Sequence, residues 1–204
     1  MHDLHIYRPI AAGDKLVTQA TMVDVKAIKP GAAYTMRLDT HDAGSGELVC
    51  RTYQLGIYRG VEISGPPTSS EAVPKSPSLA ATGAATPLEI RLDGGLAHTY
   101  TECARIWNPI HTDRAVALRA GLPDIILHVT ATLALAVSKI VDQCLDRNSS
   151  RITRLGSRFA AMVPVPSTIV LEVTNAGGGP FGFQVLTTDG QTAINGGFML
   201  YTSG

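Results

Sequence analysis

An apolar helical segment in the second half of the chain, Ile126 to Leu145, constrains the fold more than any other feature. Small and apolar residues run almost all the way round it: Ala131, Thr132, Leu133, Ala134, Ala136 and Val137. A helix at a protein surface keeps a polar face, so a helix with this little polar surface must be covered on most sides. We expect a β-sheet to wrap it.

The remainder of the chain reads mainly as strands. Alternating and β-branched runs separated by Gly, Pro and Asp predict strands at Lys15–Val25, Tyr34–Asp39, Leu48–Tyr58, Pro87–Leu92, Phe159–Val165, Thr168–Thr174, Phe181–Thr187 and Thr192–Tyr201. Asp189-Gly190 is typical of a hairpin turn, and we read Gly177 to Gly179 as a turn. Short helices are expected at Leu96–Arg105 and at Arg114–Ala120, the second ended by Gly121. This pattern predicts an α+β fold.

The chain divides by composition into two β-rich segments and a connection. Residues 65–86 are rich in Pro, Ser, Ala and Thr, with few large apolar side chains, so we predict a linker there. The predicted domains are therefore residues 1–64 and 87–204. A weak internal similarity between them suggests two copies of one unit, of which only the second carries a helix ahead of its strands.

Composition excludes several classes of function. The 17 basic and 17 acidic residues cancel, which gives no electrostatic support for binding nucleic acid or an anionic membrane. The three cysteines lack CxxC spacing and predict neither a disulfide framework nor a metal site: Cys50, Cys103 and Cys144. No apolar run reaches the ~18 residues that span a bilayer, and the N-terminus lacks a signal-like apolar region. We expect a cytoplasmic protein.

Residues whose side chains could take part in catalysis lie just ahead of the apolar helix. A proline-stiffened run, Asn108-Pro109-Ile110-His111, follows the only tryptophan, Trp107. Together with several neighbours this run resembles the hydratase-2 motif of MaoC-like dehydratases and (R)-specific enoyl-CoA hydratases. The residues that carry the resemblance are Tyr100, Ala104, Asn108 to His111, Asp113, Gly121, Leu122, Leu127, His128 and Thr130 to Ala134. It covers about Pro87 to the C-terminus.

The resemblance implies a hotdog fold, in which an antiparallel sheet wraps a long central helix, here as a degenerate double hotdog. It also implies reversible hydration of a trans-2-enoyl thioester of CoA or an acyl carrier, without a cofactor. In such enzymes an Asp and a His hold the water, and a backbone N–H at the helix start polarises the thioester carbonyl. Developing negative charge is well met by the donors of a helix N-terminus, and an imidazole suits proton transfer near neutral pH.

Two positions depart from the motif. Ile106 stands where the motif has its Asp, and Val129 stands where it has a Gly after the helix-start His. Glu102 is the possible substitute carboxylate, since it lies four residues before Ile106 and shares its face if the helix continues. Asp113 is expected to cap the following helix. The predicted catalytic residues are His111, Asn108, which we expect to hold the loop, and Glu102; the predicted substrate-binding residues are Ile106, Trp107, His128, Val129 and Thr130.

Three functions remain open at this point. The first is a hydratase or dehydratase of acyl-CoA with His111 as acid and base. The second is an acyl-CoA-binding or scaffold subunit that lost its chemistry with Ile106, and the third is a hotdog thioesterase. Because sheet edges need covering, we expect a homodimer or a hetero-oligomer with another hotdog chain.

Overall fold

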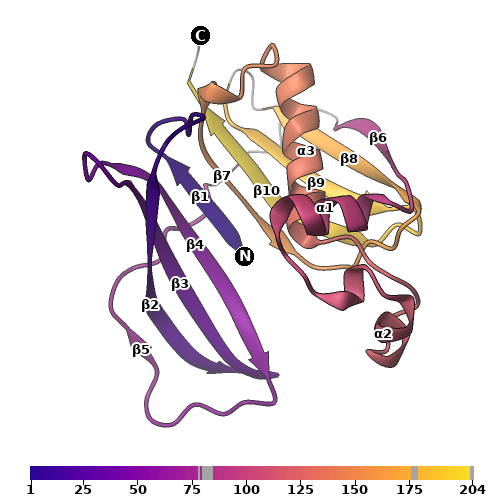
Figure 1. Ribbon diagram of the computed structural model, residues 1–204, viewed down its shortest axis with the longest axis horizontal. Helices are drawn as coiled ribbons and strands as arrows, with labels where there is room; N and C mark the ends of the chain where they lie inside the picture. The colour runs from indigo at the N-terminus through magenta and orange to yellow at the C-terminus, as the bar shows by residue number, and fades with distance from the viewer. Residues whose placement is uncertain (78, 80–84, 176–178, 203–204) are drawn as a thin grey trace. The chain divides into compact units, whose positions relative to one another are not determined.

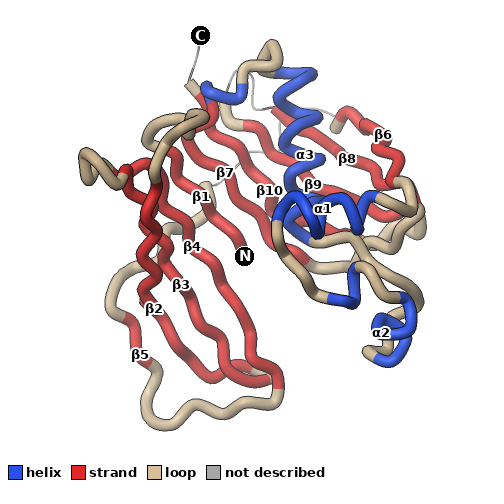
Figure 2. Tube along the Cα trace, viewed as in Figure 1, coloured by secondary structure: helices blue, strands red, loops and turns tan. Residues whose placement is uncertain are grey.

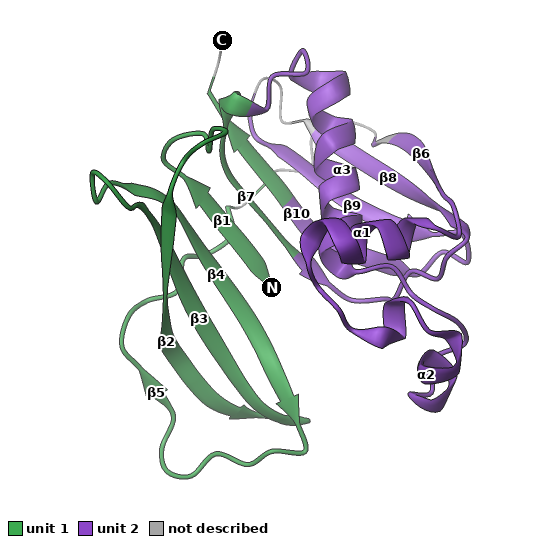
Figure 3. Ribbon diagram, in the orientation of Figure 1, with its two compact units in different colours: residues 1–79, 150–157, 198–204 green, residues 80–149, 158–197 purple. Residues whose placement is uncertain are grey.

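The computed structural model describes residues 1–77, 79, 85–175 and 179–202. The chain forms two compact units (Figure 3). The first unit comprises residues 1–79, 150–157 and 198–204, and the second comprises residues 80–149 and 158–197. Both are built on antiparallel strands, and the described α-helices all belong to the second unit (Figure 2).

The first unit is a sheet with three long strands and shorter ones beside them. Its elements are β1 (His2–Ile6), β2 (Leu16–Ile28), β3 (Gly31–Asp42), β4 (Leu48–Arg59), β5 (Thr68–Ser69) and the start of β7 (Ile152–Phe159). The strand order is β5-β2-β3-β4-β1-β7, with antiparallel pairing. Asp39 lies opposite Arg51, and Arg37 lies opposite Tyr53. Since side chains alternate across a strand, these four side chains share one face of the sheet.

That face carries a charged network beside buried uncharged side chains such as Ala33 and Thr35. Asp39 accepts hydrogen bonds from Arg37 and Arg51, and Glu71 accepts from Arg37 and, at 3.0 Å, from the Tyr53 hydroxyl. A second group lies on β1 and β7, where Arg154 donates to both carboxylate oxygens of Asp3 at 2.9 and 2.7 Å and to the Lys75 carbonyl. Pairing of this kind is what allows carboxylates to be buried.

The predicted linker, residues 65–86, is partly built into this unit. Thr68–Ser69 pairs with β2, and Glu71 and Lys75 hold the segment onto the charged face. Residues 78 and 80–84 lie outside the described part of the chain. The predicted domain limits at 64 and 86 stay a prediction.

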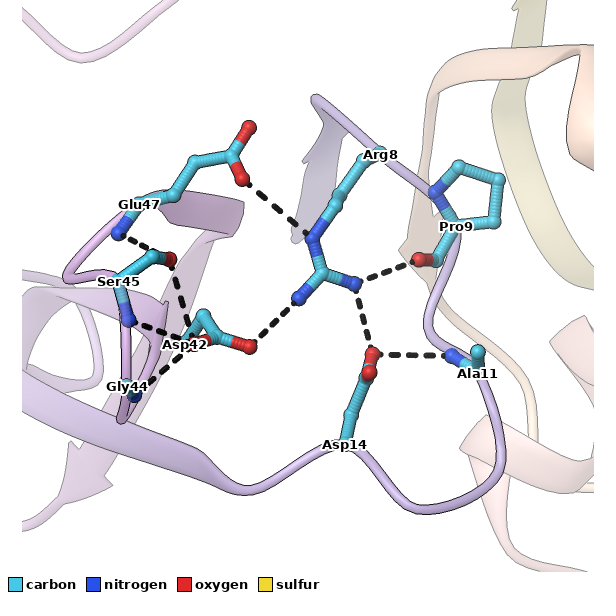
Figure 4. A network of polar contacts seen from close by, with 8 residues as sticks. All are labelled: Arg8, Pro9, Ala11, Asp14, Asp42, Gly44, Ser45 and Glu47. Atoms are coloured by element: carbon cyan, nitrogen blue, oxygen red, sulfur yellow. Dashed lines mark hydrogen bonds and ion pairs between the residues drawn. The ribbon is translucent and has the colours of Figure 1, made fainter.

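Arg8 braces the loop between β1 and β2 (Figure 4). Its guanidinium donates to Asp14 at 2.7 Å and to Asp42 at 3.0 Å, and lies 3.7 Å from Glu47. Asp42 also accepts backbone N–H groups in the β3–β4 turn. One arginine thus joins two turns that lie far apart in sequence.

The second unit carries the helices. Its strands are β6 (Thr86–Leu92), β8 (Ser167–Asn175), β9 (Phe181–Thr187) and β10 (Thr192–Tyr201), in the order β6-β8-β9-β10; β7 and β10 contribute residues to both units. Its helices are α1 (Leu96–Ala104), η1 (Pro109–His111, a 3-10 helix), α2 (Arg114–Arg119) and α3 (Val129–Cys144), and a further 3-10 helix, η2 (Ser149–Arg151), reaches into the first unit.

Helix α3 lies along the sheet of the second unit (Figure 1). Its inner residues are buried: Ala131, Thr132, Leu133, Ala136, Ile140 and Val141. The facing strands are equally buried, with Ile169, Leu171 and Val185 fully covered. The expectation that a sheet wraps this helix is confirmed.

Two predicted elements are misplaced, and one predicted helix ends a residue early. Helix α3 begins at Val129 rather than Ile126, because Ile126 forms a bridge with Pro164 and the Leu127 N–H donates to Val163. The strand predicted at Phe159–Val165 lies earlier, as β7. Helix α1 ends at Ala104, since Arg105 is left-handed with φ 55°. Of the turn predicted at Gly177 to Gly179, the first two residues lie outside the described part of the chain.

Candidate active site

The loop that carries the NPIH run is held by its own polar groups. The Asn108 side chain accepts the Ile110 N–H at 3.4 Å and begins η1, as expected of a residue that holds the loop. Asp113 then accepts the N–H groups of Ala115 and Val116 at 2.8 and 3.2 Å. The predicted cap of the following helix is confirmed, and the loop is pinned at its far end.

His111 is oriented by a backbone carbonyl. Its Nδ1 lies 2.7 Å from the Ile126 oxygen. A carbonyl only accepts hydrogen bonds, so Nδ1 carries the ring proton in the neutral imidazole and Nε2 keeps a lone pair. His111 therefore offers a base at Nε2.

His128 is buried at the N-terminus of α3, with 3% of its surface exposed. Its Nε2 lies 3.2 Å from the Ile106 carbonyl oxygen and 3.4 Å from the Thr101 hydroxyl, which itself donates to Ala97. Both neighbours can only accept, so Nε2 carries the proton. The Nδ1 atom of His128 is buried and has no protein partner.

His128 stays neutral near pH 7. Burial lowers its pKa, and the nearby His111 lowers that pKa further, against the opposing effect of the Ile106 carbonyl. A buried imidazole without a carboxylate partner is most stable uncharged.

The two imidazoles are stacked on one another. Their ring centroids lie 3.7 Å apart with an interplanar angle of 24°, and the Tyr100 ring lies 5.1 Å from His128 on a tilted plane. The motif predicted His111 and His128 separately, and the fold brings them together. Nothing in the sequence indicated this stack, because the two histidines are 17 residues apart and no periodic pattern links them.

Glu102 is not brought onto the face of Ile106. The helix that would have aligned them ends at Ala104, and Glu102 instead accepts the Trp107 indole N–H at 3.3 Å. Ile106 and Trp107 are 42% and 65% exposed. The condition that made Glu102 a substitute carboxylate is therefore not met, and its contact is with the indole rather than with an imidazole.

Val129 and Thr130 open helix α3. The first N–H groups of an α-helix have no partner within the helix and carry its positive partial charge. Val129 borders a narrow space of about 10 Å³ together with Thr132, Val163 and Ile194. The predicted oxyanion donor position is thus beside a small apolar space.

A larger pocket of about 450 Å³ was not foreseen from the sequence. It lies beside Ile126, whose carbonyl holds His111, and its other lining residues are Pro123, Ala160, Ala161, Met162, Pro164, Ser167, Thr187, Thr188, Asp189 and Gln191. It depends on residues 160–166 being a loop, where the sequence predicted a strand.

His98 was also not foreseen from the sequence. Its Nε2 lies 3.1 Å from the Thr112 carbonyl, so it braces the loop that carries the NPIH run.

Across the described residues, no group of three His, Cys, Asp or Glu side chains is placed to hold a metal ion. Across the same residues, no helix combines the length and the apolar character needed to cross a bilayer.

Comparison with known proteins supplies the family. The model of the MaoC like domain matches residues 86–195. The chain is similar to the peroxisomal enoyl-CoA hydratase 2 of Arabidopsis thaliana, with 25% identity over 177 residues that cover 83% of the chain and 57% of the relative. It is also similar to the peroxisomal multifunctional enzyme type 2 of Mus musculus, with 26% identity over 184 residues, or 85% of the chain and 23% of the relative. The chain thus spans less than two thirds of either relative.

Solved structures show the fold. A MaoC-like dehydratase from Phytophthora capsici superposes with a TM-score of 0.89 at 20% identity, over all of the chain and 70% of the other. The peroxisomal multifunctional enzyme type 2 of Drosophila melanogaster gives a TM-score of 0.82 at 21% identity, over 98% of the chain and 36% of the other. The predicted hotdog fold is confirmed, and the likeness to the first structure extends through both units.

Proposed function

Because the chain belongs to the MaoC-like dehydratase family, whose domain model matches more than half of it, we propose that it is a hydro-lyase of the enoyl-CoA hydratase type. The substrate is a trans-2-enoyl-CoA in one direction and a 3-hydroxyacyl-CoA in the other. One observation carries the proposal: His111 offers Nε2 as a base, because its Nδ1–H is committed to the Ile126 carbonyl.

The reaction uses two parts of the site, His111 and the first turn of α3. His111 Nε2 takes a proton from water as the water oxygen bonds to C3 of the enoyl group, and the C2–C3 π electrons move to the thioester oxygen. N–H groups in the first turn of α3, that of Val129 among them, stabilise the enolate. The imidazolium of His111 then returns its proton to C2, which completes the addition of one water.

The assignment of a CoA thioester as the substrate rests on the relatives. The Arabidopsis relative is named an enoyl-CoA hydratase, and acyl-CoA as the sole reactant beside water fits a site that uses only imidazole and backbone groups. Acyl chain length stays open. No separate observation favours thioester hydrolysis.

The test is turnover of a short and a medium trans-2-enoyl-CoA, followed by loss of the conjugated-thioester absorbance. His111→Ala should lower kcat/KM by about 100-fold or more, the usual contribution of a general acid or base. His41→Gln, on β3 of the first unit, is the matched control and should keep full activity. Equal activity in wild type and His111→Ala would refute the proposal.

One observation favours the second candidate, a binding subunit without chemistry. Position 106 holds an exposed isoleucine, and the Glu102 carboxylate accepts the indole N–H of Trp107. This candidate predicts acyl-CoA binding by calorimetry without turnover, and a gain of turnover in Ile106→Asp. Turnover by the wild type that is lost in His111→Ala would exclude it.

Assembly and location remain proposals. We propose a homodimer or a complex with another hotdog chain. Light scattering on the protein as it elutes from a size-exclusion column would measure the molar mass of the assembly. The cytoplasmic location stays a prediction, and both curated relatives carry peroxisomal names.

A further inference from the structure

The stacked imidazoles have complementary proton positions. His111 holds its proton on Nδ1 and His128 holds its proton on Nε2, each because the nearest oxygen can only accept. Each ring is therefore fixed in one tautomer by a different segment, Ile126 ahead of α3 and Ile106 in the loop. The arrangement ties the loop and the start of α3 together at two points.

His128 restrains His111 in two separable ways. Its ring covers one face of the His111 ring at 3.7 Å, which opposes rotation of that ring away from the Ile126 carbonyl. Its Nε2–H holds the Ile106 carbonyl and so fixes the beginning of the loop on which His111 lies. Because His128 is buried, its ring is held in place by packing, and both restraints on His111 therefore come from a fixed side chain.

The charge state of His128 also matters to its neighbour. In the proposed reaction His111 becomes positively charged. A second positive charge stacked at 3.7 Å would oppose that change, whereas a neutral ring face attracts a cation. Among the described residues, the buried Nδ1 of His128 has no hydrogen-bond partner, so no described carboxylate is bonded there to draw a proton onto the ring.

We propose that His128 is a positioning residue for His111: it keeps the His111 ring in the Nδ1–H tautomer, with Nε2 available, and it holds the Ile106 end of the loop. The proposal deepens the proposed function and rests on it for its effect on rate. Its effect on the tautomer of His111 can be measured without any substrate.

Two variants separate the two restraints. His128→Gln keeps an amide N–H that can reach the Ile106 carbonyl but removes the ring. His128→Phe keeps a ring on His111 but removes the donor. His98→Gln is the matched control, because it removes the imidazole that braces the loop at Thr112 without removing a ring stacked on His111.

The primary measurement is the ring ¹⁵N spectrum of His111 at pH 7.5, which distinguishes the two tautomers. We expect the Nδ1–H form in wild type, His98→Gln and His128→Phe, and a mixture of forms in His128→Gln. Hydrogen exchange of the loop amides should quicken in His128→Phe and not in His128→Gln. A single Nδ1–H form in His128→Gln, which lacks the stacked ring, would overturn the proposal.

Turnover supplies the second readout. The Gln variant should lose about 10- to 100-fold in kcat, with KM changed far less, since a displaced base slows the chemical step rather than binding. A thermal melt confirms that each variant is folded. If wild type shows no hydration while the tautomer of His111 still shifts in His128→Gln, the positioning role stands and the proposed function fails. A fall in kcat with no change in tautomer would count against the positioning role.

Discussion

Both units build antiparallel sheets, but in the described part of the chain only the second covers its sheet with a helix, and the first buries charged residues among its apolar ones. In the second unit the sheet is covered by helix α3, whose residues Ala136 and Ile140 are fully buried. In the first unit, buried Val49 and Tyr53 lie in the same sheet as ion pairs, with Asp39 held between two arginines. An apolar helix is stabilised by close packing alone, whereas a buried charge destabilises the fold unless it is paired and hydrogen-bonded. The proposed chemistry lies in the unit with the helix, since a helix start supplies both the ring of His128 and unpaired N–H donors.

The largest expected effect tests the apolar side of this contrast. Ile140→Ala should lower the free energy of unfolding by about 2–5 kcal/mol, because it removes a fully buried side chain and leaves a cavity. Urea denaturation measures the change. Leu118→Ala on α2 is the control; that side chain is 47% exposed and should contribute little. A loss for Ile140→Ala no larger than for Leu118→Ala would show that α3 is not the main support of its sheet.

The next effect tests the charged side. Asp39→Asn removes the carboxylate shared by Arg37 and Arg51, and should cost about 1–3 kcal/mol at pH 7, less than for a fully buried pair because both arginines are partly exposed. Burial by itself would raise the pKa of Asp39, but the hydrogen bonds from Arg51 and Arg37 outweigh it and hold the pKa below its usual value.

A lowered carboxyl pKa fixes the sign of the pH dependence. The stabilisation by Asp39 is fully present above the pKa of the unfolded chain, about 4, and is lost as pH falls through the lower folded pKa. The difference in unfolding free energy between wild type and Asp39→Asn should therefore shrink below about pH 4. The difference for Ile140→Ala should not follow that curve. If the difference in unfolding free energy between wild type and Asp39→Asn stayed constant from pH 7 to pH 3, it would contradict the pairing of Asp39 with Arg37 and Arg51.

The sequence predicted elements where local pattern and final environment agree. Strands β9 and β10 lie where expected, as does α2 within one residue. The strand predicted at Phe159–Val165 lies earlier, as β7, and its position was missed because Ile152–Phe159 contains two arginines, a glycine and a serine, which is a poor local strand signal. Arg154 is accommodated there by Asp3, a residue 151 positions away. Partners at such separation leave no periodicity in the sequence.

The candidate site shows the same limit. The NPIH run predicted His111, and the helix-start position predicted a donor at Val129. The stack of His111 on His128, the tie from His128 to Ile106 and the pocket beside Ile126 arise only when separate segments meet. The continuation of α1 toward Ile106 failed for a local reason, the left-handed Arg105, which the side-chain pattern did not reveal.

The smallest expected effect concerns charge pairs at the surface of the first unit. Arg8→Gln removes the guanidinium that joins Asp14 and Asp42 (Figure 4). The pKa of Asp14 is lowered by the Ala11 N–H first and by Arg8 second, so the loop keeps part of its support without the arginine. Because exposed pairs are screened by water and salt, the loss of stability should be smaller than for Asp39→Asn and should fade in high salt. Lys26→Gln, which removes a single exposed pair with Asp24, is the control and should change stability less than Arg8→Gln. Urea denaturation at low and high salt measures both. A salt-insensitive loss in Arg8→Gln as large as that of Asp39→Asn would mean that the contrast between the units depends on the whole charged network rather than on its buried members.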